Sequence, residues 1–313
     1  MGGAIIACPQ SSAVGDCRPC DEDSAAGLRI RQLHVSAPLL TSGQLDTIAP
    51  HVRRLVATNP SFMTGPGTNT YILGRERFVI IDPGPADGRH LERILDATRG
   101  AIDRVLVTHT HRDHSPGAKA LAAATHASVC GMVAPDDGHQ DLTFAPDHVL
   151  ADNDAIAFDA GALRALHTPG HASNHICYLL EGSGLLFTGD HLMQGSTVVI
   201  APPDGNMQAY LDSLARLQRE PVARLAPGHG FTIEDAQAEI AHIIAHRLKR
   251  EAKVFAKVQE LGPATLDALV ARVYDDVDPR LHALAKSSLL AHLQKLAQDG
   301  RLACTDGQWA VRA

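Results

Sequence analysis

The sequence predicts an α+β fold: an αββα sandwich of two mixed sheets with helices outside, followed by a small C-terminal domain of winged-helix outline. Three observations predict it. Short apolar strands alternate with helical stretches up to about residue 226, and hairpins interrupt that alternation. From residue 233 onward, long helical stretches are followed by a two-stranded ribbon. We therefore expect a flexible leader over 1–28, a main domain over 29–240 and a winged-helix-like domain over 241–313.

The composition of the 313-residue chain is that of a globular protein. Hydrophobic residues make up 45% and charged residues 20%, which is enough apolar material for a core. A net charge of -7 argues against nucleic-acid binding over the whole surface. No apolar run approaches the ~18 residues of a transmembrane helix, no secretory signal is evident, and the six cysteines form no disulfide pattern. We therefore expect a cytoplasmic protein without membrane contact.

The predicted leader shows no sustained periodicity and contains Gly, Ser, Pro and acidic residues, as flexible termini do. Its Cys17 and Cys20 form a single CxxC pair. No second pair and no nearby histidine completes a zinc site, so we interpret this pair as part of a mobile tail.

The main domain is predicted from apolar runs bounded by turn residues. A turn at 74–77 separates the two strands of a hairpin, and the Gly-Pro-Gly-Thr-Asn stretch at 65–69 is typical of a loop. Strands are predicted over 52–57, 71–73, 78–81, 104–107, 128–132, 155–158, 163–166, 176–180, 184–188 and 223–226, and helices over 90–98, 118–125 and 207–217. Loops after strands are where α/β proteins place their sites.

The C-terminal domain is predicted from three helices and a terminal hairpin. Thr265 is placed to cap the second helix, and an Asp-Gly turn at 306–307 joins the two strands. The helices are predicted over 234–257, 266–273 and 279–298, and the strands over 301–304 and 308–311. Three helices followed by a two-stranded ribbon form the outline of a winged helix.

Histidines and aspartates gather at four points, each directly after a predicted strand. Within six residues the chain offers His109, His111, Asp113 and His114. Imidazole and carboxylate are ligands that zinc takes, and the spacing lets the first two residues meet one ion while the last two turn toward a second. The set is completed by His171, Asp190 and His229, with Asp190 placed to bridge two ions. The sequence therefore predicts a metal centre.

This pattern resembles the metallo-β-lactamase superfamily: an HxHxDH motif, then His, Asp and His in order, after an Ile-Asp-Pro-Gly strand end at 81–84. The resemblance covers about residues 50–235 and implies two bound metal ions. The implied ligands are His109, His111 and His171 for the first ion, Asp113, His114 and His229 for the second, and Asp190 as the bridge. Asp82 matches an aspartate near the metals and is expected to orient a ligand.

More narrowly, the chain resembles the β-lactamase-like-protein-2 group. The features are Asn59-Pro60 with Gly-Thr-Asn-Thr-Tyr at 67–71, Gly-Asp-His at 189–191 before Gly-Ser-Thr at 195–197, and the C-terminal segment. That group includes endoribonucleases acting on single-stranded RNA and thioesterases that release polyketides. Glyoxalase II shares the HxHxDH motif, but this chain lacks its Gly-Cys-Gly-Arg stretch and its basic C-terminus, and true β-lactamase activity is not expected.

The resemblance and the ligand set imply a zinc-dependent hydrolase with two Zn²⁺ ions per chain, although iron or manganese also suits such ligands. A hydroxide between the ions would attack an acyl or phosphoryl centre. Asp113 is expected to accept a proton from the attacking water. His175 is the second candidate catalytic residue, acting on substrate or through a ligand, unless it is an ordinary interior histidine. Ser196 and Thr197 are candidates for the pocket wall.

The C-terminal segment bears on the substrate. It carries a small excess of Lys and Arg but no aromatic platform for bases, so a lid, a pocket wall or a homodimer contact is favoured over nucleic-acid binding. Basic residues available to an anionic substrate are Arg247, Lys249, Arg250 and Lys253. The leading function is hydrolysis of a thioester or small acyl ester, a small-molecule substrate. The alternatives are an endoribonuclease on single-stranded RNA and a metal-bound protein without turnover.

Overall fold

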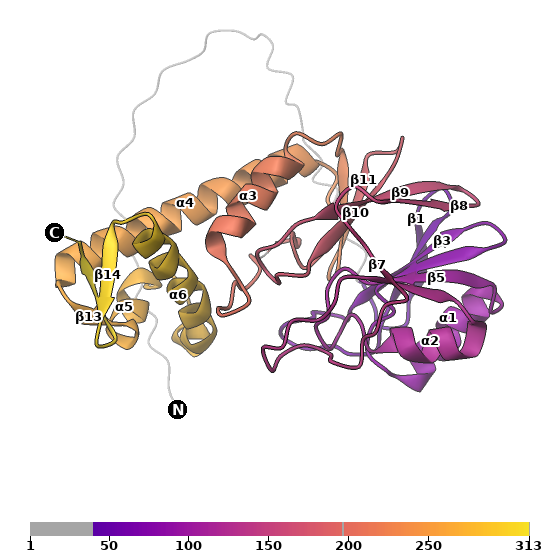
Figure 1. The fold of residues 1–313 in the computed structure, drawn as a ribbon, viewed down its shortest axis with the longest axis horizontal. Coiled ribbons are helices and arrows are strands. Elements are labelled where there is room, and N and C mark those ends of the chain that lie inside the picture. The colour runs from indigo at the N-terminus through magenta and orange to yellow at the C-terminus, as the bar shows by residue number, and fades with distance from the viewer. Residues whose placement is uncertain (1–39, 196, 313) are drawn as a thin grey trace, which may run out of the picture. The chain divides into compact units, whose positions relative to one another are not determined.

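The computed structural model describes residues 40–195 and 197–312. The predicted leader with Cys17 and Cys20 lies outside the described residues, and so does Ser196. Two large sheets and one small sheet organise the described part of the chain (Figure 1). None of the helices in these ranges combines the length and the apolar character that crossing a bilayer requires.

The first sheet has seven strands in the order β1-β2-β3-β4-β5-β6-β7. Neighbours are antiparallel up to β4 and parallel from β4 onward. Helices α1 (Gly88–Thr98) and α2 (Gly117–Thr125) cover its outer face, where Ile80, Ile94 and Leu121 share one apolar cluster. The strands are β1 (Leu45–Ala49), β2 (Val52–Val56), β3 (Asn69–Gly74), β4 (Phe78–Ile81), β5 (Ile102–Leu106), β6 (Ser128–Gly131) and β7 (His148–Val149).

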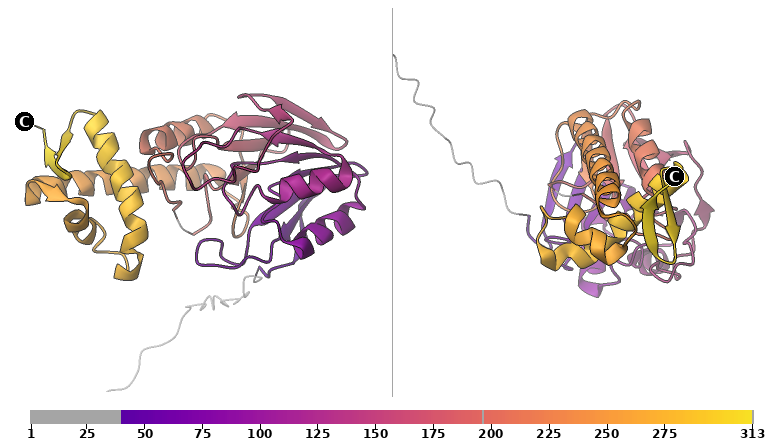
Figure 2. Two further views of the ribbon diagram at one scale, coloured as in Figure 1. Left: turned by 60° about the horizontal axis from the view of Figure 1, so that its bottom comes forward. Right: turned by 90° about the vertical axis from the view of Figure 1, so that its left-hand side faces the viewer.

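The second sheet has five strands in the order β12-β11-β10-β9-β8, antiparallel except for the parallel pair β11 and β12. Its outer face packs on α3 (Met207–Leu217) and on the first turns of α4 (Ala236–Leu261). Between the sheets lies a core that includes Tyr71 and Phe187. The strands are β8 (Ala155–Phe158), β9 (Gly161–His167), β10 (Ile176–Leu180), β11 (Leu185–Gly189) and β12 (Arg224–Pro227). The predicted αββα sandwich is confirmed (Figure 2).

The C-terminal elements form a winged helix with its own core. After α4 come α5 (Leu266–Val273), the 3-10 helix η1 (Pro279–Leu281) and α6 (His282–Gln298). Strands β13 (Ala264–Thr265), β14 (Leu302–Thr305) and β15 (Gln308–Val311) pair in the order β13-β15-β14. Trp309 packs there against Val254 and Leu289 in one cluster.

Helix α4 belongs to both cores. Ile240 and Ile243 pack with α3 and the second sheet, whereas Val254 and Val258 pack with the winged helix. The predicted boundary at 240/241 falls within this helix, so the division into domains stays a proposal. One continuous helix therefore contributes apolar side chains to both packing units.

His90 of α1 is expected to make the protein sensitive to acid. Its ring is fully buried, and burial lowers its pKa to about 4, below the 6.5 of a free histidine. Between these values the unfolded chain takes up a proton that the folded chain refuses, so this contribution to stability is complete above pH 6.5 and falls as the pH drops toward 4. The expected slope is about 1.4 kcal/mol per pH unit.

The measurement is the free energy of unfolding by urea between pH 6.5 and 4, with His90→Gln compared with the natural chain. His90→Gln should flatten the acid slope, because glutamine does not titrate. His148→Gln is the matched control, since His148 is exposed. Equal slopes for the natural chain and His90→Gln would refute the role assigned to His90.

Candidate metal centre

The seven predicted ligands all lie on loops that leave the ends of strands. β5 ends at Leu106, β9 at His167, β11 at Gly189 and β12 at Pro227, and each is followed within a few residues by predicted ligands. β5 lies in the first sheet and the other three lie in the second. The sandwich therefore brings together side chains that are up to 120 positions apart in the sequence, from His109 to His229.

Asp82 fixes the loop after β5. It follows β4 with a φ of 52°, a left-handed conformation uncommon for a residue with a side chain. Its carboxylate accepts hydrogen bonds from Thr108 N (2.7 Å) and Thr108 Oγ1 (2.8 Å). It also contacts His114 Nδ1 at 2.8 Å, so that Nε2 of the same ring is directed elsewhere. This geometry is the one expected of an aspartate that orients a ligand.

Asn69 and Tyr71, from the Gly-Thr-Asn-Thr-Tyr motif, hold the loop that carries His229. Asn69 Nδ2 donates to the carbonyls of Pro227 and Gly230, both at 2.9 Å. The hydroxyl of Tyr71 donates to the Pro227 carbonyl at 2.6 Å. The Gly-Thr-Asn-Thr-Tyr motif therefore has a physical role, because its side chains hold the turn on both sides of the candidate ligand His229.

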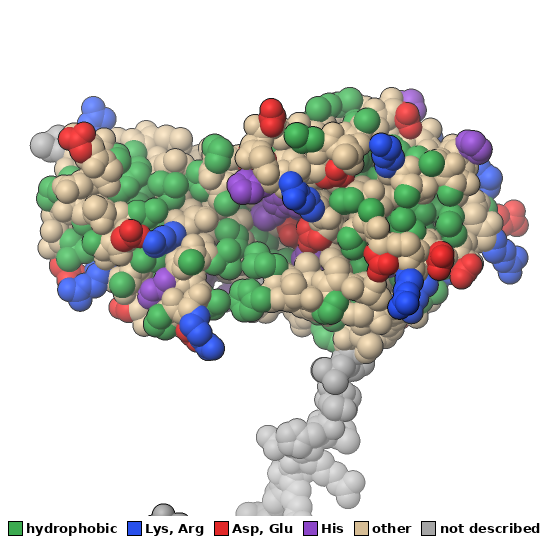
Figure 3. All heavy atoms as spheres, turned by 90° about the horizontal axis from the view of Figure 1, so that it is seen from below, with side chains coloured by type: hydrophobic (Ala, Val, Ile, Leu, Met, Phe, Trp, Pro, Cys, Tyr) green, Lys and Arg blue, Asp and Glu red, His purple; other side chains and the backbone are tan. Residues whose placement is uncertain are grey.

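A cleft of about 490 Å³ exposes part of this centre. Figure 3 shows histidine and acidic side chains gathered in a hollow of one face, bordered by hydrophobic side chains. The predicted ligands that line the cleft are His111, Asp113, His171, Asp190 and His229. His109 and His114 lie beneath them, 1% and 0% exposed.

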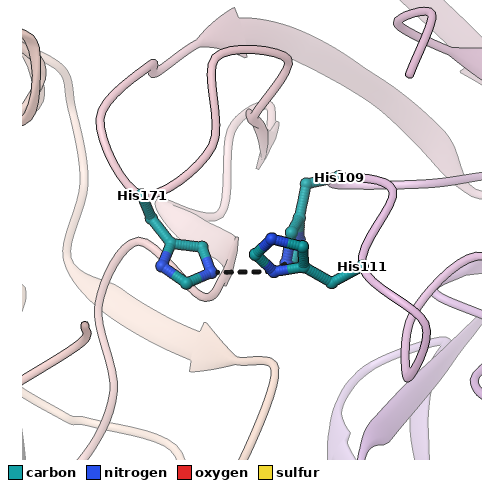
Figure 4. A group of neighbouring side chains, drawn as sticks. All are labelled: His109, His111 and His171. Atoms are coloured by element: carbon teal, nitrogen blue, oxygen red, sulfur yellow. Dashed lines mark hydrogen bonds between the residues drawn. The ribbon is translucent and has the colours of Figure 1, made fainter. Parts of the chain in front are cut away.

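The first group of nitrogens comes from His109, His111 and His171 (Figure 4). His111 Nδ1 lies 2.9 Å from His109 Nε2 and 3.1 Å from His171 Nε2. Such spacings fit nitrogens placed about 2.0–2.1 Å from one shared zinc ion. The second nitrogens of two of the rings are held from outside: His109 Nδ1 by Thr108 Oγ1 at 3.0 Å and His171 Nδ1 by the Val199 carbonyl at 2.7 Å.

The second group comes from Asp113, His114 and His229. Asp113 Oδ2 lies 3.2 Å from His229 Nε2 and 3.5 Å from His114 Nε2. Asp190 lies between the groups: its Oδ1 is 3.4 Å from both His114 Nε2 and His229 Nε2, and its Oδ2 is 3.8 Å from His171 Nε2. One carboxylate thus faces both groups, as its predicted bridging role requires.

Unpaired polar atoms show that a cation fits this site. His114 Nε2 and Asp190 Oδ1 are buried and have no hydrogen-bond partner within the described ranges. Leaving such atoms unpaired costs about 1–3 kcal/mol each. Burial alone would raise the pKa of Asp113, but His114 and His229 lower it to about 2. The carboxylate is therefore ionised at neutral pH, as a metal ligand must be.

Removing the charge of Asp82 should weaken metal binding. Asp82→Asn keeps the shape of the side chain but replaces one oxygen with a donor facing His114 or Thr108. Loss of such a supporting contact typically costs about 10–100-fold in metal affinity. Competition with a chromogenic chelator measures that affinity. Asp147→Asn is the control, because Asp147 likewise accepts from a backbone N–H, of Val129, away from the site. Equal affinity in both variants would contradict the supporting role.

His175 lies behind the candidate ligands. Its ring is fully buried, stacks on His109 at a centroid distance of 5.1 Å, and places Nδ1 3.0 Å from Thr168 Oγ1. It does not line the cleft. Of the roles predicted for His175, this position fits support of a ligand and not contact with substrate. Its catalytic importance stays a prediction.

Three titratable residues of the cleft were not predicted from the sequence: Asp137, His139 and Asp204. Asp204 accepts a hydrogen bond from Ser173 N at 3.0 Å, which ties its loop to the one carrying His171. These residues lie in irregular loops, and no motif or strand end marks them. Thr197 lies in the wall of an adjoining cavity, and Arg112 is exposed, as its position between ligands predicts.

Comparison with known families identifies the class of this protein. Residues 63–229 match the model described as the metallo-beta-lactamase superfamily, and residues 265–309 match the beta-lactamase associated winged helix domain. The chain belongs to the metallo-beta-lactamase superfamily, a family of hydrolases that bind divalent metal ions. The resemblance predicted from the HxHxDH pattern is confirmed.

Two relatives and one solved structure are similar to this chain over most of their lengths. The chain is 32% identical to a Beta-lactamase-like protein 2 homolog of Drosophila melanogaster, over 80% of this chain and 89% of that protein. It is also 32% identical to an atrochrysone carboxyl ACP thioesterase of Aspergillus chevalieri, over 83% of this chain and 85% of that protein. A beta-lactamase domain protein from Burkholderia ambifaria has the same fold, with a TM-score of 0.74 at 24% identity, over 88% of this chain and 96% of that structure.

Proposed function

We propose that this protein is a dinuclear metal-dependent hydrolase of a thioester or small acyl ester. The observation that carries the proposal is the pair of adjacent ligand groups facing one shared carboxylate, Asp190. The first ion would be held by His109, His111 and His171, and the second by Asp113, His114 and His229. Nitrogen and carboxylate ligands favour zinc, and iron or manganese would also be accepted.

When bound, a metal pair supplies a water of lowered pKa and polarises the electrophilic oxygen of the substrate. The chain itself contributes position and charge. The side chain of Asp113 is 30% exposed in the cleft, against 13% for Asp190, so Asp113 is the ligand carboxylate best placed to meet a reacting water and accept its proton. Asp82 and Asn69 hold the ligand loops fixed, which pre-orients the site.

The charge of the cleft favours an acyl substrate over RNA. The cleft is lined by the aspartates Asp113, Asp137, Asp190 and Asp204, with no lysine or arginine among its described lining residues. A polyanionic backbone would be repelled wherever the metals do not offset these charges. The thioesterase among the relatives supports the same choice.

The test is hydrolysis by the purified, zinc-loaded full chain of acyl-coenzyme A thioesters, N-acetylcysteamine thioesters and aryl lactones. We expect turnover of at least one class, lowered by about 10³-fold in Asp113→Asn, a loss of about 4 kcal/mol of transition-state stabilisation. Arg112→Gln is the control, since Arg112 lies inside the motif but is exposed.

Other outcomes separate the alternatives. Inactivity on every acyl substrate with metal-dependent cleavage of labelled single-stranded RNA would replace this proposal by the endoribonuclease. No turnover of either kind, with no more than one tightly held ion per chain, would indicate a metal-bound binding protein. Elemental analysis of the purified protein gives the ion count.

A further inference from the structure

A second cavity, of about 400 Å³, adjoins the metal cleft where the winged helix meets the main domain. Its walls come from distant parts of the chain: Phe62 and Met63 from the loop before β3, Val198 from the loop after β11, and Tyr274 and Leu281 from the winged helix. Most of the lining is apolar. Met63, Val198 and Leu284 line both hollows, so the two hollows are direct neighbours.

Arg247 gives this apolar cavity a positive charge. It belongs to α4, lines the cavity and is only 3% exposed. Its guanidinium donates to the Val198 carbonyl and stands over the ring of Tyr210 at 5.4 Å. Arg247 Nε is buried without a hydrogen-bond partner, and no carboxylate in the described part of the chain forms an ion pair with Arg247.

The neighbouring Arg250, in contrast to Arg247, has a carboxylate partner. It forms a two-pronged ion pair with Asp276, with nitrogen–oxygen distances of 2.8 and 2.9 Å. No aspartate or glutamate lines this cavity among the residues that the structure describes. A buried guanidinium with a free donor and no counter-ion is costly unless a ligand supplies an acceptor.

We propose that this cavity, called the seam cavity, binds the acyl part of the substrate, an apolar chain or ring that carries an anionic oxygen received by Arg247. The inference rests on the proposed function for the position of the scissile bond, which would lie in the metal cleft. The two hollows differ in charge: aspartates line the cleft and arginines line the seam cavity. A substrate with its negative group remote from the scissile bond matches that polarity.

Binding of two matched dyes to the metal-free full chain tests the seam cavity without any hydrolysis. Anilinonaphthalene sulfonate and N-phenylnaphthylamine share one aromatic body, and only the first carries an anionic group. Both fluoresce more strongly in apolar surroundings. We expect saturable binding of one anionic dye per chain, with an affinity lowered by about 10–100-fold in Arg247→Met, because a charge-assisted hydrogen bond is lost. The neutral dye should bind Arg247→Met at least as well as the natural chain.

Three further variants keep the test decisive if Arg247→Met misfolds. Ala285 lines the seam cavity on α6, and Ala285→Phe should fill it and weaken both dyes. Ala283→Phe, on the exposed side of α6, is the control for added bulk, and Lys249→Met, an exposed position on α4, is the control for lost charge. Neither control should change dye binding.

Unchanged affinity for the anionic dye in Arg247→Met, or unchanged affinity for both dyes in Ala285→Phe, would overturn the inference. These results do not depend on turnover, so a chain that binds the dyes as expected but hydrolyses nothing would refute only the proposed function. If the protein is an active thioesterase, Arg247→Met should raise KM for acyl groups that end in a carboxylate and leave KM for neutral acyl groups unchanged.

Discussion

Replacing Asp190 by alanine is expected to lower hydrolysis by at least about 10³-fold and to reduce the bound metal to one ion or fewer per chain. Asp190 is the carboxylate that faces both ligand groups, with Oδ1 3.4 Å from His114 Nε2 and Oδ2 3.8 Å from His171 Nε2. Removing it leaves the two ligand groups without the negative charge between them. Repulsion between two cations held there would then oppose loading of the second site.

Elemental analysis after dialysis and steady-state kinetics on the best substrate measure the two effects separately. Asp190→Asn keeps the shape of the side chain, so its loss of metal would assign the effect to charge. Asp136→Asn is the control, because Asp136 is exposed and lies outside the cleft. Full metal content with full activity in Asp190→Ala would contradict the two-metal arrangement.

Replacing Gly170 by alanine should destabilise the protein and displace His171. Gly170 has a φ of 147°, and an added Cβ would lie 2.4 Å from the Cα and 2.5 Å from the Cβ of Tyr210 in α3. The clash is with backbone, so it cannot be relieved by a change of rotamer. Strain and overpacking together should cost about 3 kcal/mol or more. For a chain of this size the expected fall in Tm is roughly 6–12 °C.

Calorimetry of metal-free protein measures this fall without interference from bound ions. Gly88→Ala is the control: Gly88 begins α1, and an added Cβ meets nothing within 4 Å. Alanine there should leave Tm unchanged or raise it slightly, because glycine is the poorer helix former. If Gly170→Ala and Gly88→Ala had the same Tm, α3 would have moved to accommodate the added Cβ. That result would contradict the close packing of Tyr210 against Gly170.

Much of the fold could be predicted because its strands are short apolar runs ended by turn residues. The runs at 78–81 and 176–180 appear in the structure as β4 and β10 with the predicted bounds. β1 and β7 were not predicted, since β1 is half-exposed and β7 has only two residues, so neither has a full apolar run. The C-terminal helices were predicted, but not that α4 would serve two cores, which depends on what packs against each end.

The candidate ligands could be chosen from the sequence because His109 to His114 lie within one loop, where local spacing limits what the side chains can reach. The residues that line the cleft could not be predicted from local spacing in this way. Asp137 and Asp204 line the same cleft although they belong to two loops far apart in the chain. Arg247 and Lys249 look alike as basic residues near the start of the C-terminal segment, yet the structure buries the first and exposes the second.

The sequence by itself therefore determined the candidate ligands of this protein, since their types, their order and their places after strands are properties of the chain. Only the tertiary structure decided what surrounds those candidate ligands. Which face of α4 points inward depends on contacts with α6 and with the loop after β11, as the hydrogen bond from the Arg247 guanidinium to the Val198 carbonyl illustrates. Contacts of this kind arise from packing between distant segments, and no local pattern encodes them.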